Sequence, residues 1–328
     1  MTTARIVCVG AGRMGRGIAH VFAYAGHRVT VIDAKAREAD AAARLLDAAR
    51  DEIRGDLDFL HSLGVLSEAQ VAAILARISW VARSGAAQAL ATADVVFEAV
   101  REVMEAKREA FALIAAAAPK RAVVASTTST LPVARLAELI TAPRRFLNAH
   151  WLNPAFLIPL VEVSPGPDTA DETVNALTAL LKAVGKVPVV CAARPGYIIP
   201  RLQALIMNEA ARMVEEGVAS AEDIDTAIRA GFGIRYAVLG VLEFIDFGGG
   251  DILYYASKHL TQALGSDRYD MPDIVKRNME EGKLGLATGQ GFYDFGDIDG
   301  DAYRRDRLAT FVRLLEHLDL MPRPGDAD

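Results

Sequence analysis

Short runs of β-branched and other apolar residues alternate with longer alanine-rich stretches from the N-terminus to about Val190. This alternation predicts a largely parallel sheet covered by helices, an α/β domain. The predicted strands are 5–9, 28–32, 94–99, 122–125, 146–150, 160–163 and 188–190.

The stretch 36–78 breaks that rhythm because its apolar positions follow a helical period only. Gly64 is a predicted stop, and Ser67 is a predicted N-cap for the helix that follows. We therefore expect two helices that project from the sheet as a hairpin-like insertion and can lean over a ligand.

After Cys191 the β pattern stops and the chain is almost entirely helical in pattern, starting near Pro195. We predict an α/β domain over 1–192 and an all-helical domain over 193–328. The helical part is rich in apolar residues that would be exposed in a lone domain, among them the pair Tyr254 and Tyr255. A homodimer would cover them, and an ordinary intrachain core is the alternative.

Composition narrows the range of partners and compartments. The 328 residues carry a net charge of -6 with no long run of Lys or Arg, which disfavours nucleic acid and anionic membranes. No apolar run approaches the roughly 18 residues of a membrane span. Cys8 and Cys191 suggest no disulfide framework and no metal-ligand spacing. We expect a reduced, cytoplasmic protein without a secretory signal and without a metal site.

A glycine-rich turn directly follows the first predicted strand and opens a helix. Its residues are Gly10, Ala11, Gly12, Arg13, Met14 and Gly15. In this context the three glycines permit a tight turn, close approach of backbone to a pyrophosphate, and close packing of helix on sheet. The helix N-terminus then offers free N–H donors to the phosphates.

Asp33 ends the second predicted strand, where a carboxylate accepts hydrogen bonds from the adenosine ribose hydroxyls and repels a 2′-phosphate. The cofactor is therefore predicted to be NAD rather than NADP. Lys35 and Arg37 lie nearby and weaken this preference.

His150 and Glu162 stand on two short apolar runs that we predict to be adjacent strands. A carboxylate beside an imidazole fixes its tautomer and stabilises the imidazolium formed when the other nitrogen takes a proton. Taken alone, such a histidine is more often a satisfied core residue. Oxidation of an alcohol by NAD, however, requires a general base, and His150 ends its strand at the ligand-binding edge. His20, His27, His61, His259 and His317 show no obvious acidic partner.

Together these residues resemble the 3-hydroxyacyl-CoA dehydrogenase family, which includes lambda-crystallin and the L-gulonate 3-dehydrogenases. The resemblance runs from about Arg5 to about Phe295. Besides the glycine turn it rests on residues 97–102 (FEAVRE), 125–131 (ASTTSTL), His150 with Asn153 and Pro154, Glu162, residues 195–198 (PGYI) and 288–293 (TGQGFY).

The resemblance implies a role for each matching residue. His150 would be the catalytic base, Glu162 would orient it, and Ser129 would hydrogen-bond the substrate oxygen. Glu102, Lys107 and Asn153 match positions that contact or support the nicotinamide half of NAD. From the residues alone, Ser129 could instead cap a helix, and Glu102 with Lys107 could be a surface charge pair.

The sequence departs from the family pattern at three points. Pro200 stands where the acyl-CoA enzymes carry an Asn that binds the substrate carbonyl, and Gln203 one turn later could substitute. Ala287 replaces a tail Lys that reaches the cofactor site. The insertion at 36–78 interleaves its arginines with acids, although a CoA nucleotide would favour basic residues.

These departures favour a smaller substrate, and Arg235 offers an anchor for it. The stretch 233–240 resembles the hydroxy-acid members, which have an Arg here, and a guanidinium can bind a free carboxylate with two hydrogen bonds. Pairing of Arg235 with Glu243, or a place in a subunit interface, is the equal alternative.

We therefore predict NAD-dependent oxidation or reduction of an L-3-hydroxyacyl group, carried by a CoA thioester or a free 3-hydroxy acid. A non-catalytic, crystallin-like NAD-binding protein is the alternative from another class. A third possibility, a hydroxy-acid dehydrogenase that uses a catalytic Lys in the interdomain helix, is disfavoured because no Lys lies between Pro195 and Gly217.

Overall fold

The computed structural model describes residues 3–322. Its contacts divide the chain into two compact units, with the division between Ile206 and Met207 inside helix α8 (Ile199–Glu215). The predicted boundary at 192–193 lies before α8, whereas the contacts divide the chain within that helix. Each unit is described below by itself.

An eight-stranded sheet forms the centre of the first unit, in the order β3-β2-β1-β4-β5-β6-β7-β8. Its strands are β1 (Arg5–Val9), β2 (Arg28–Ile32), β3 (Ile78–Val81), β4 (Val95–Glu98), β5 (Val123–Ser126), β6 (Phe146–Trp151), β7 (Leu160–Pro165) and β8 (Val187–Val190). The chain runs outward from β1 to β3 and then returns to place β4 on the other side of β1. This reversal of strand order is where open α/β sheets bind ligands.

Strands β1 to β6 run parallel, but β7 pairs antiparallel with β6, and β8 is parallel to β7. The reason is the short connection 152–159, which has no crossover helix and so returns the chain in the opposite direction. Strand β3 was not predicted, because Ile78–Val81 follows the insertion too closely to stand out as a separate run.

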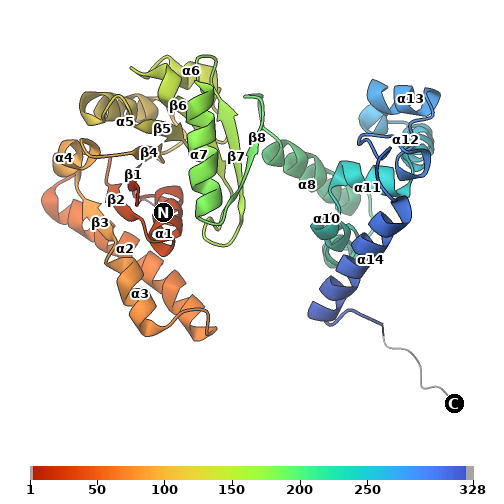
Figure 1. Ribbon diagram of the computed structural model, residues 1–328, viewed down its shortest axis with the longest axis horizontal. Helices are drawn as coiled ribbons and strands as arrows, with labels where there is room; N and C mark the ends of the chain where they lie inside the picture. The colour runs from red at the N-terminus through yellow and green to blue at the C-terminus, as the bar shows by residue number, and fades with distance from the viewer. Residues whose placement is uncertain (1–2, 323–328) are drawn as a thin grey trace. The chain divides into compact units, whose positions relative to one another are not determined.

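Helices cover both faces of this sheet (Figure 1). One core lies against α1 (Arg13–Tyr24), α2 (Ala39–Ser62), α3 (Glu68–Leu75) and α7 (Asp171–Ala183). The other lies against α4 (Ala86–Leu90), α5 (Met104–Ala117) and α6 (Val133–Ala137). The pleat sends alternate side chains of β1 to opposite cores, Ile6 and Cys8 to the first and Val7 and Val9 to the second. Strands buried on both faces explain the near-continuous apolar runs of the sequence.

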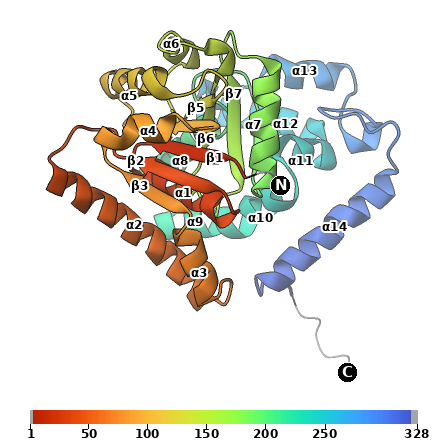
Figure 2. The same cartoon turned by 60° about the vertical axis from the view of Figure 1, so that its left-hand side comes forward.

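Residues 36–78 hold α2 and α3, which extend beyond the sheet (Figure 2). Ser67 caps α3 in a reciprocal capping box with Gln70, and Gly64 takes a positive φ of 74° just after α2 ends. The side chain of Leu57 is fully buried in the first core, so α2 is anchored although its outer end protrudes.

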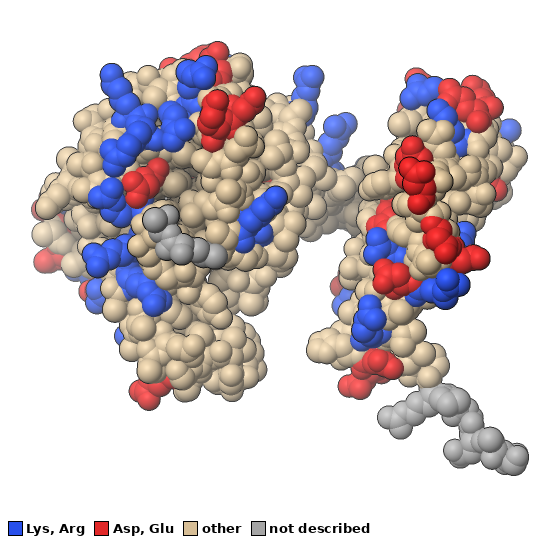
Figure 3. Space-filling model, viewed as in Figure 1, with Lys and Arg blue, Asp and Glu red and all other residues tan. Residues whose placement is uncertain are grey.

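The second unit is helical. After the end of α8 come α9 (Ala221–Ala227), α10 (Ile234–Val238), α11 (Val241–Gly248), α12 (Gly250–Leu264), α13 (Asp273–Glu280) and α14 (Gly300–His317). Buried Asp246 of α11 accepts hydrogen bonds from the backbone N–H groups of Phe292 and Tyr293 at 3.0 and 2.8 Å, which fixes the turn between α13 and α14. Side chains of both charge signs are interspersed on the face of each unit shown in Figure 3.

Candidate active site

The glycine turn sits at the junction of β1 and α1, where its backbone is too close to neighbouring atoms for a side chain. A Cβ on Gly10, whose φ is 121°, would lie 2.5 Å from the carbonyl oxygen of Ala99. A Cβ on Gly15 would lie 1.9 Å from the carbonyl oxygen of Gly10. The N-terminus of α1 is thereby held against the sheet edge with its N–H groups free for an anion.

A cavity of about 550 Å³ opens at this turn. The cavity is lined by the predicted cofactor residues Gly10, Ala11, Gly12, Arg13, Met14 and Asp33. Gly15 does not line the cavity but packs against the backbone of Gly10. The shape and the donors fit a dinucleotide, because backbone N–H groups and a ribose-binding carboxylate face one space.

Asp33 is buried after the end of β2, and its carboxylate is already engaged. The side chain of Arg37 donates to it at 2.9 Å, and the backbone N–H of Lys35 donates at 3.2 Å. Arg37 therefore neutralises this carboxylate and also lines the cavity.

His150 and Glu162 lie directly opposite each other on β6 and β7. The antiparallel pairing brings His150 Nδ1 within 2.7 Å of Glu162 Oε2, with the imidazole 5% exposed and the carboxylate residue fully buried. An ionised carboxylate only accepts, so Nδ1 carries the proton and Nε2 is left as the acceptor. The pair can take one proton at Nε2.

The second oxygen of Glu162 is held by the start of α8. Oε1 accepts hydrogen bonds from the backbone N–H groups of Ile198 and Ile199 at 2.8 and 2.9 Å. Tyr197, in the same turn, stacks on the His150 ring. This use of the Pro-Gly-Tyr-Ile turn was not predicted; its only signal in the sequence is an aromatic residue directly after a Pro-Gly pair.

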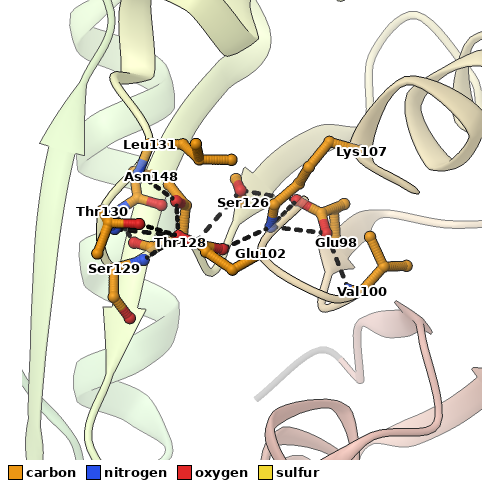
Figure 4. A network of polar contacts seen from close by, with 10 residues as sticks. All are labelled: Glu98, Val100, Glu102, Lys107, Ser126, Thr128, Ser129, Thr130, Leu131 and Asn148. Atoms are coloured by element: carbon orange, nitrogen blue, oxygen red, sulfur yellow. Dashed lines mark hydrogen bonds and ion pairs between the residues drawn. The ribbon is translucent and has the colours of Figure 1, made fainter. Parts of the chain in front are cut away.

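Ser129 lies in the loop between β5 and α6. Within the described residues its hydroxyl makes no hydrogen bond, and the cap of α6 is Pro132, so Ser129 does not serve as a helix cap. Its side chain points away from the polar network beside it (Figure 4). The hydroxyl is half-buried and free to donate to a ligand.

That network connects the ends of β4 and β5 with the middle of β6 (Figure 4). Lys107 is fully buried and places its Nζ 2.9 and 3.0 Å from the two oxygens of Glu98, with a further ion pair to Glu102 at 3.3 Å. The alternative of a surface charge pair is wrong for Lys107, because its side chain is fully buried. A buried ammonium must be compensated by carboxylates. Glu98, for which no role was predicted, supplies that compensation. An acid inside the apolar run Val95–Glu98 was the signal.

Glu102 organises the loop that carries Ser129. One carboxylate oxygen accepts from the backbone N–H groups of Ser129 and Thr130 at 2.9 and 3.0 Å and from the hydroxyl of Thr128. Burial by itself would raise the pKa of Glu102, but these hydrogen bonds and the charge of Lys107 outweigh it and lower the pKa to about 2. Glu102 is therefore ionised at any working pH.

Asn148 extends the network to β6, where its amide nitrogen donates to the carbonyl oxygen of Thr128 at 3.2 Å. Asn153 is exposed in the loop after β6, next to a cis peptide bond with Pro154. Gln203, proposed as a substitute at Pro200, has an exposed side chain on α8.

The model of the family described as 3-hydroxyacyl-CoA dehydrogenase, NAD binding domain, matches residues 5–194, and that of its C-terminal domain matches residues 196–295. The chain belongs to the 3-hydroxyacyl-CoA dehydrogenase family. The α/β unit carries the NAD-binding domain of that family, followed by the helical domain, as the sequence predicted. The protein is accordingly an NAD-dependent oxidoreductase that acts on 3-hydroxyacyl groups, and the comparisons offer no support for the non-catalytic alternative.

Relatives with different substrates resemble this 3-hydroxyacyl-CoA dehydrogenase family member to a similar degree. It is 34% identical to a probable 3-hydroxybutyryl-CoA dehydrogenase of Deinococcus radiodurans over 88% of this chain and 98% of the relative. It is 30% identical to the 5-formyl-3-hydroxy-2-methylpyridine 4-carboxylate 5-dehydrogenase of Mesorhizobium japonicum over 95% of this chain and 98% of the relative. The crystal structure of a 3-hydroxyacyl-CoA dehydrogenase from Archaeoglobus fulgidus aligns with a TM-score of 0.75 at 30% identity, covering 97% and 100% of the two chains.

In the helical unit of this family member, Arg235 is exposed on α10, and its guanidinium lies over the ring of Phe244 at 5.4 Å. Glu243 does not pair with it. That carboxylate instead accepts from Arg307 and from Tyr303. Among residues 3–322 no helix is both long and apolar enough to cross a membrane.

Proposed function

We propose that the protein interconverts an L-3-hydroxyacyl substrate and its 3-oxo form, with His150 as the general base. The observation that carries this proposal is the His150–Glu162 pair, which is buried on the paired strands β6 and β7. His150 lies near the carboxyl end of its strand, as the glycine turn does at the end of β1. Bound NAD would supply the hydride acceptor. The glycine turn and Asp33 would hold its adenosine and pyrophosphate, and Glu102, Lys107 and Asn153 would support its nicotinamide half.

In the oxidation, His150 Nε2 takes the hydroxyl proton while Glu162 stabilises the imidazolium through Nδ1. The free hydroxyl of Ser129 donates to the same substrate oxygen as it becomes a carbonyl. In the reduction these roles reverse. A positioned base of this kind contributes roughly 100- to 10,000-fold to the rate.

The test follows NADH absorbance with a panel of 3-hydroxyacyl-CoA esters and free 3-hydroxy acids. We expect His150→Ala to lower kcat by at least about 100-fold and to leave the Kd for NAD within about 2-fold. The matched control is His259→Ala, an exposed histidine of α12, which should keep full activity. Undiminished turnover in His150→Ala would remove His150 as the base, and silence across the whole panel despite NAD binding would favour the non-catalytic alternative.

A second candidate substrate is a small free 3-hydroxy acid rather than a CoA thioester. It is favoured by Arg235, whose guanidinium has no carboxylate partner among the described residues because Glu243 is taken by Arg307. The similarity to a dehydrogenase of a pyridine carboxylate points the same way. Pro200, which has no side-chain donor, weakens the case for a clamped thioester carbonyl, and Gln203 is the proposed replacement.

Arg235→Ala should raise the KM for a carboxylate substrate by about 10-fold or more, because a charge-assisted bidentate contact is lost. Arg229→Ala, an exposed arginine one element earlier, is the control. Activity confined to CoA esters and unaffected by Arg235→Ala would contradict this candidate.

We further propose a cytoplasmic homodimer, with the domain over 193–328 carrying dimer and substrate contacts. Large apolar side chains that are more than half exposed in the helical unit support the dimer, among them Met207, Val218, Ile252 and Tyr255. Two free cysteines support a reducing compartment.

A further inference from the structure

Tyr197 stacks on the proposed base in an offset arrangement. The ring centroids of His150 and Tyr197 are 5.6 Å apart, with an angle of 29° between the planes. Tyr197 is 8% exposed and His150 is 5% exposed, so the two rings exclude water from the contact. Glu162 binds the imidazole at Nδ1, and the ring of Tyr197 lies beside one of its faces.

The backbone at Tyr197 is unusual for a residue with a side chain. Its φ is 40°, a conformation that only Tyr197 and Asp319 share among the non-glycine residues described. Such a conformation strains a bulky residue and persists only where the surroundings hold it. Gly196 next to it also takes a positive φ, of 77°. A second glycine would adopt this turn with less strain, so contacts of the tyrosine side chain must compensate the strain.

The surrounding contacts hold the turn in place on both sides of Tyr197. Its N–H donates to the carbonyl oxygen of Arg194 at 3.0 Å, and the N–H groups of Ile198 and Ile199 bind Glu162. One turn of chain therefore fixes both partners of His150, the carboxylate through the backbone and the ring face through a side chain.

The ring can do more than restrict the rotation of its neighbour. The face of a tyrosine ring is negative, and a cation within about 6 Å of its centroid is stabilised, most strongly where water is excluded. His150 becomes such a cation when it takes the substrate proton. Burial, the largest cause, raises the pKa of the Tyr197 hydroxyl, so the phenol stays neutral and adds no anion of its own.

We propose that Tyr197 is a positioning residue for the catalytic base, which orients the imidazole of His150 and stabilises its protonated form through the stacked ring face. The proposal rests on the proposed function, because it requires His150 to accept the proton. The aromatic face is the active feature, and the hydroxyl is dispensable.

The test compares Tyr197→Phe, which keeps the face, with Tyr197→Leu, which keeps an apolar side chain of similar burial without it. We expect kcat to fall about 30-fold in Tyr197→Leu, while the KM and the Kd for NAD change by less than about 3-fold. Tyr197→Phe should retain at least about a third of kcat. With substrate deuterated at the carbon that loses hydride, the isotope effect on kcat should be larger in Tyr197→Leu than in wild type, because the chemical step becomes slower.

Val187→Ala on β8 serves as a control, since it removes a side chain that is more than half exposed and has no place in the site. Thermal melts of all variants separate this role from a structural one, because a loss confined to stability would lower Tm and leave kcat per folded enzyme intact. Near wild-type kcat in Tyr197→Leu overturns the proposal, and so does a fall in Tyr197→Phe as deep as that in Tyr197→Leu. Turnover retained in His150→Ala would instead defeat the proposed function itself.

Discussion

His20 shows how burial changes the meaning of a residue that the sequence leaves unremarkable. No acidic partner for His20 was predicted, but its side chain is 1% exposed and its Nδ1 lies 3.8 Å from a carboxylate oxygen of Asp56. Neither ring nitrogen has a hydrogen-bond partner, and the ring stacks on Phe156. Burial, followed by the charge of Lys186, lowers the pKa of His20 to about 4.

This depressed pKa predicts a loss of stability on mild acidification. The unfolded chain protonates His20 near its ordinary pKa of about 6.5, whereas the folded chain resists protonation down to about 4. The contribution to stability is therefore fully present above pH 6.5 and is lost progressively as the pH falls from 6.5 to about 4, by up to about 3 kcal/mol. In urea unfolding at pH 7 and pH 4.5, His20→Gln should lose clearly less stability than wild type. An equal loss in both proteins would contradict the depressed pKa.

Burial also changes the meaning of charged residues, as in Glu98, Glu102 and Lys107. The family resemblance placed Glu102 and Lys107 at the cofactor site. Only the structure adds Glu98, whose carboxylate explains why the ammonium of Lys107 can be fully buried there. The spacing of Glu98 and Lys107 along the sequence does not predict that they share a site without water, because their contact depends on how α5 packs against β4.

At the scale of the element, the junction of β1 and α1 is the part that the sequence predicted most fully. Gly15 packs against Gly10 so closely that even one added carbon would displace the turn. We expect Gly15→Ala to weaken NAD binding by at least about 10-fold and to destabilise the fold by about 1–3 kcal/mol through overpacking.

The control for this prediction is Gly55→Ala in α2. A Cβ there meets nothing within 4 Å, so the helix should gain up to about 1 kcal/mol and NAD binding should be unchanged. Calorimetric titration with NAD and thermal melts of both variants provide the measurement. Equal NAD affinity in Gly15→Ala and wild type would contradict a cofactor seated on this turn.

The pairing of β6 with β7 was predicted only as adjacency, and its antiparallel direction is what brings His150 and Glu162 into register. The direction follows from the short connection 152–159. The turn at Gly196 and Tyr197 could not be predicted as a third component of the pair, because it reaches Glu162 from 36 residues away along the chain.

At the scale of the whole molecule, the helical unit leaves an apolar stripe on α12. Ile252, Leu260 and Leu264 are all exposed and, at 3.6 residues per turn, fall on one side of the helix. The proposed homodimer would cover a surface of this kind.

If α12 takes part in that dimer, Ile252→Glu should shift the protein toward the monomer in sedimentation or light-scattering measurements. Lys258→Glu changes the charge by more but lies on the other side of the same helix, so it should leave the assembly intact. A monomeric wild type, or a dimer unaffected by Ile252→Glu, would contradict this role of the stripe.

The sequence by itself determined the α/β and helical domains, the dinucleotide turn, and the family that supplies His150, Glu162 and Ser129. It could do so because period, glycine placement and strand context are local properties of a chain. Tertiary structure alone decided the direction of β7, the burial of Lys107 with Glu98, the burial of His20 without a hydrogen bond, and the contact of Tyr197 with His150. These depend on which elements pack together and where water is excluded, and the free energy of a charge or a ring contact changes with its surroundings far more than with its position along the chain.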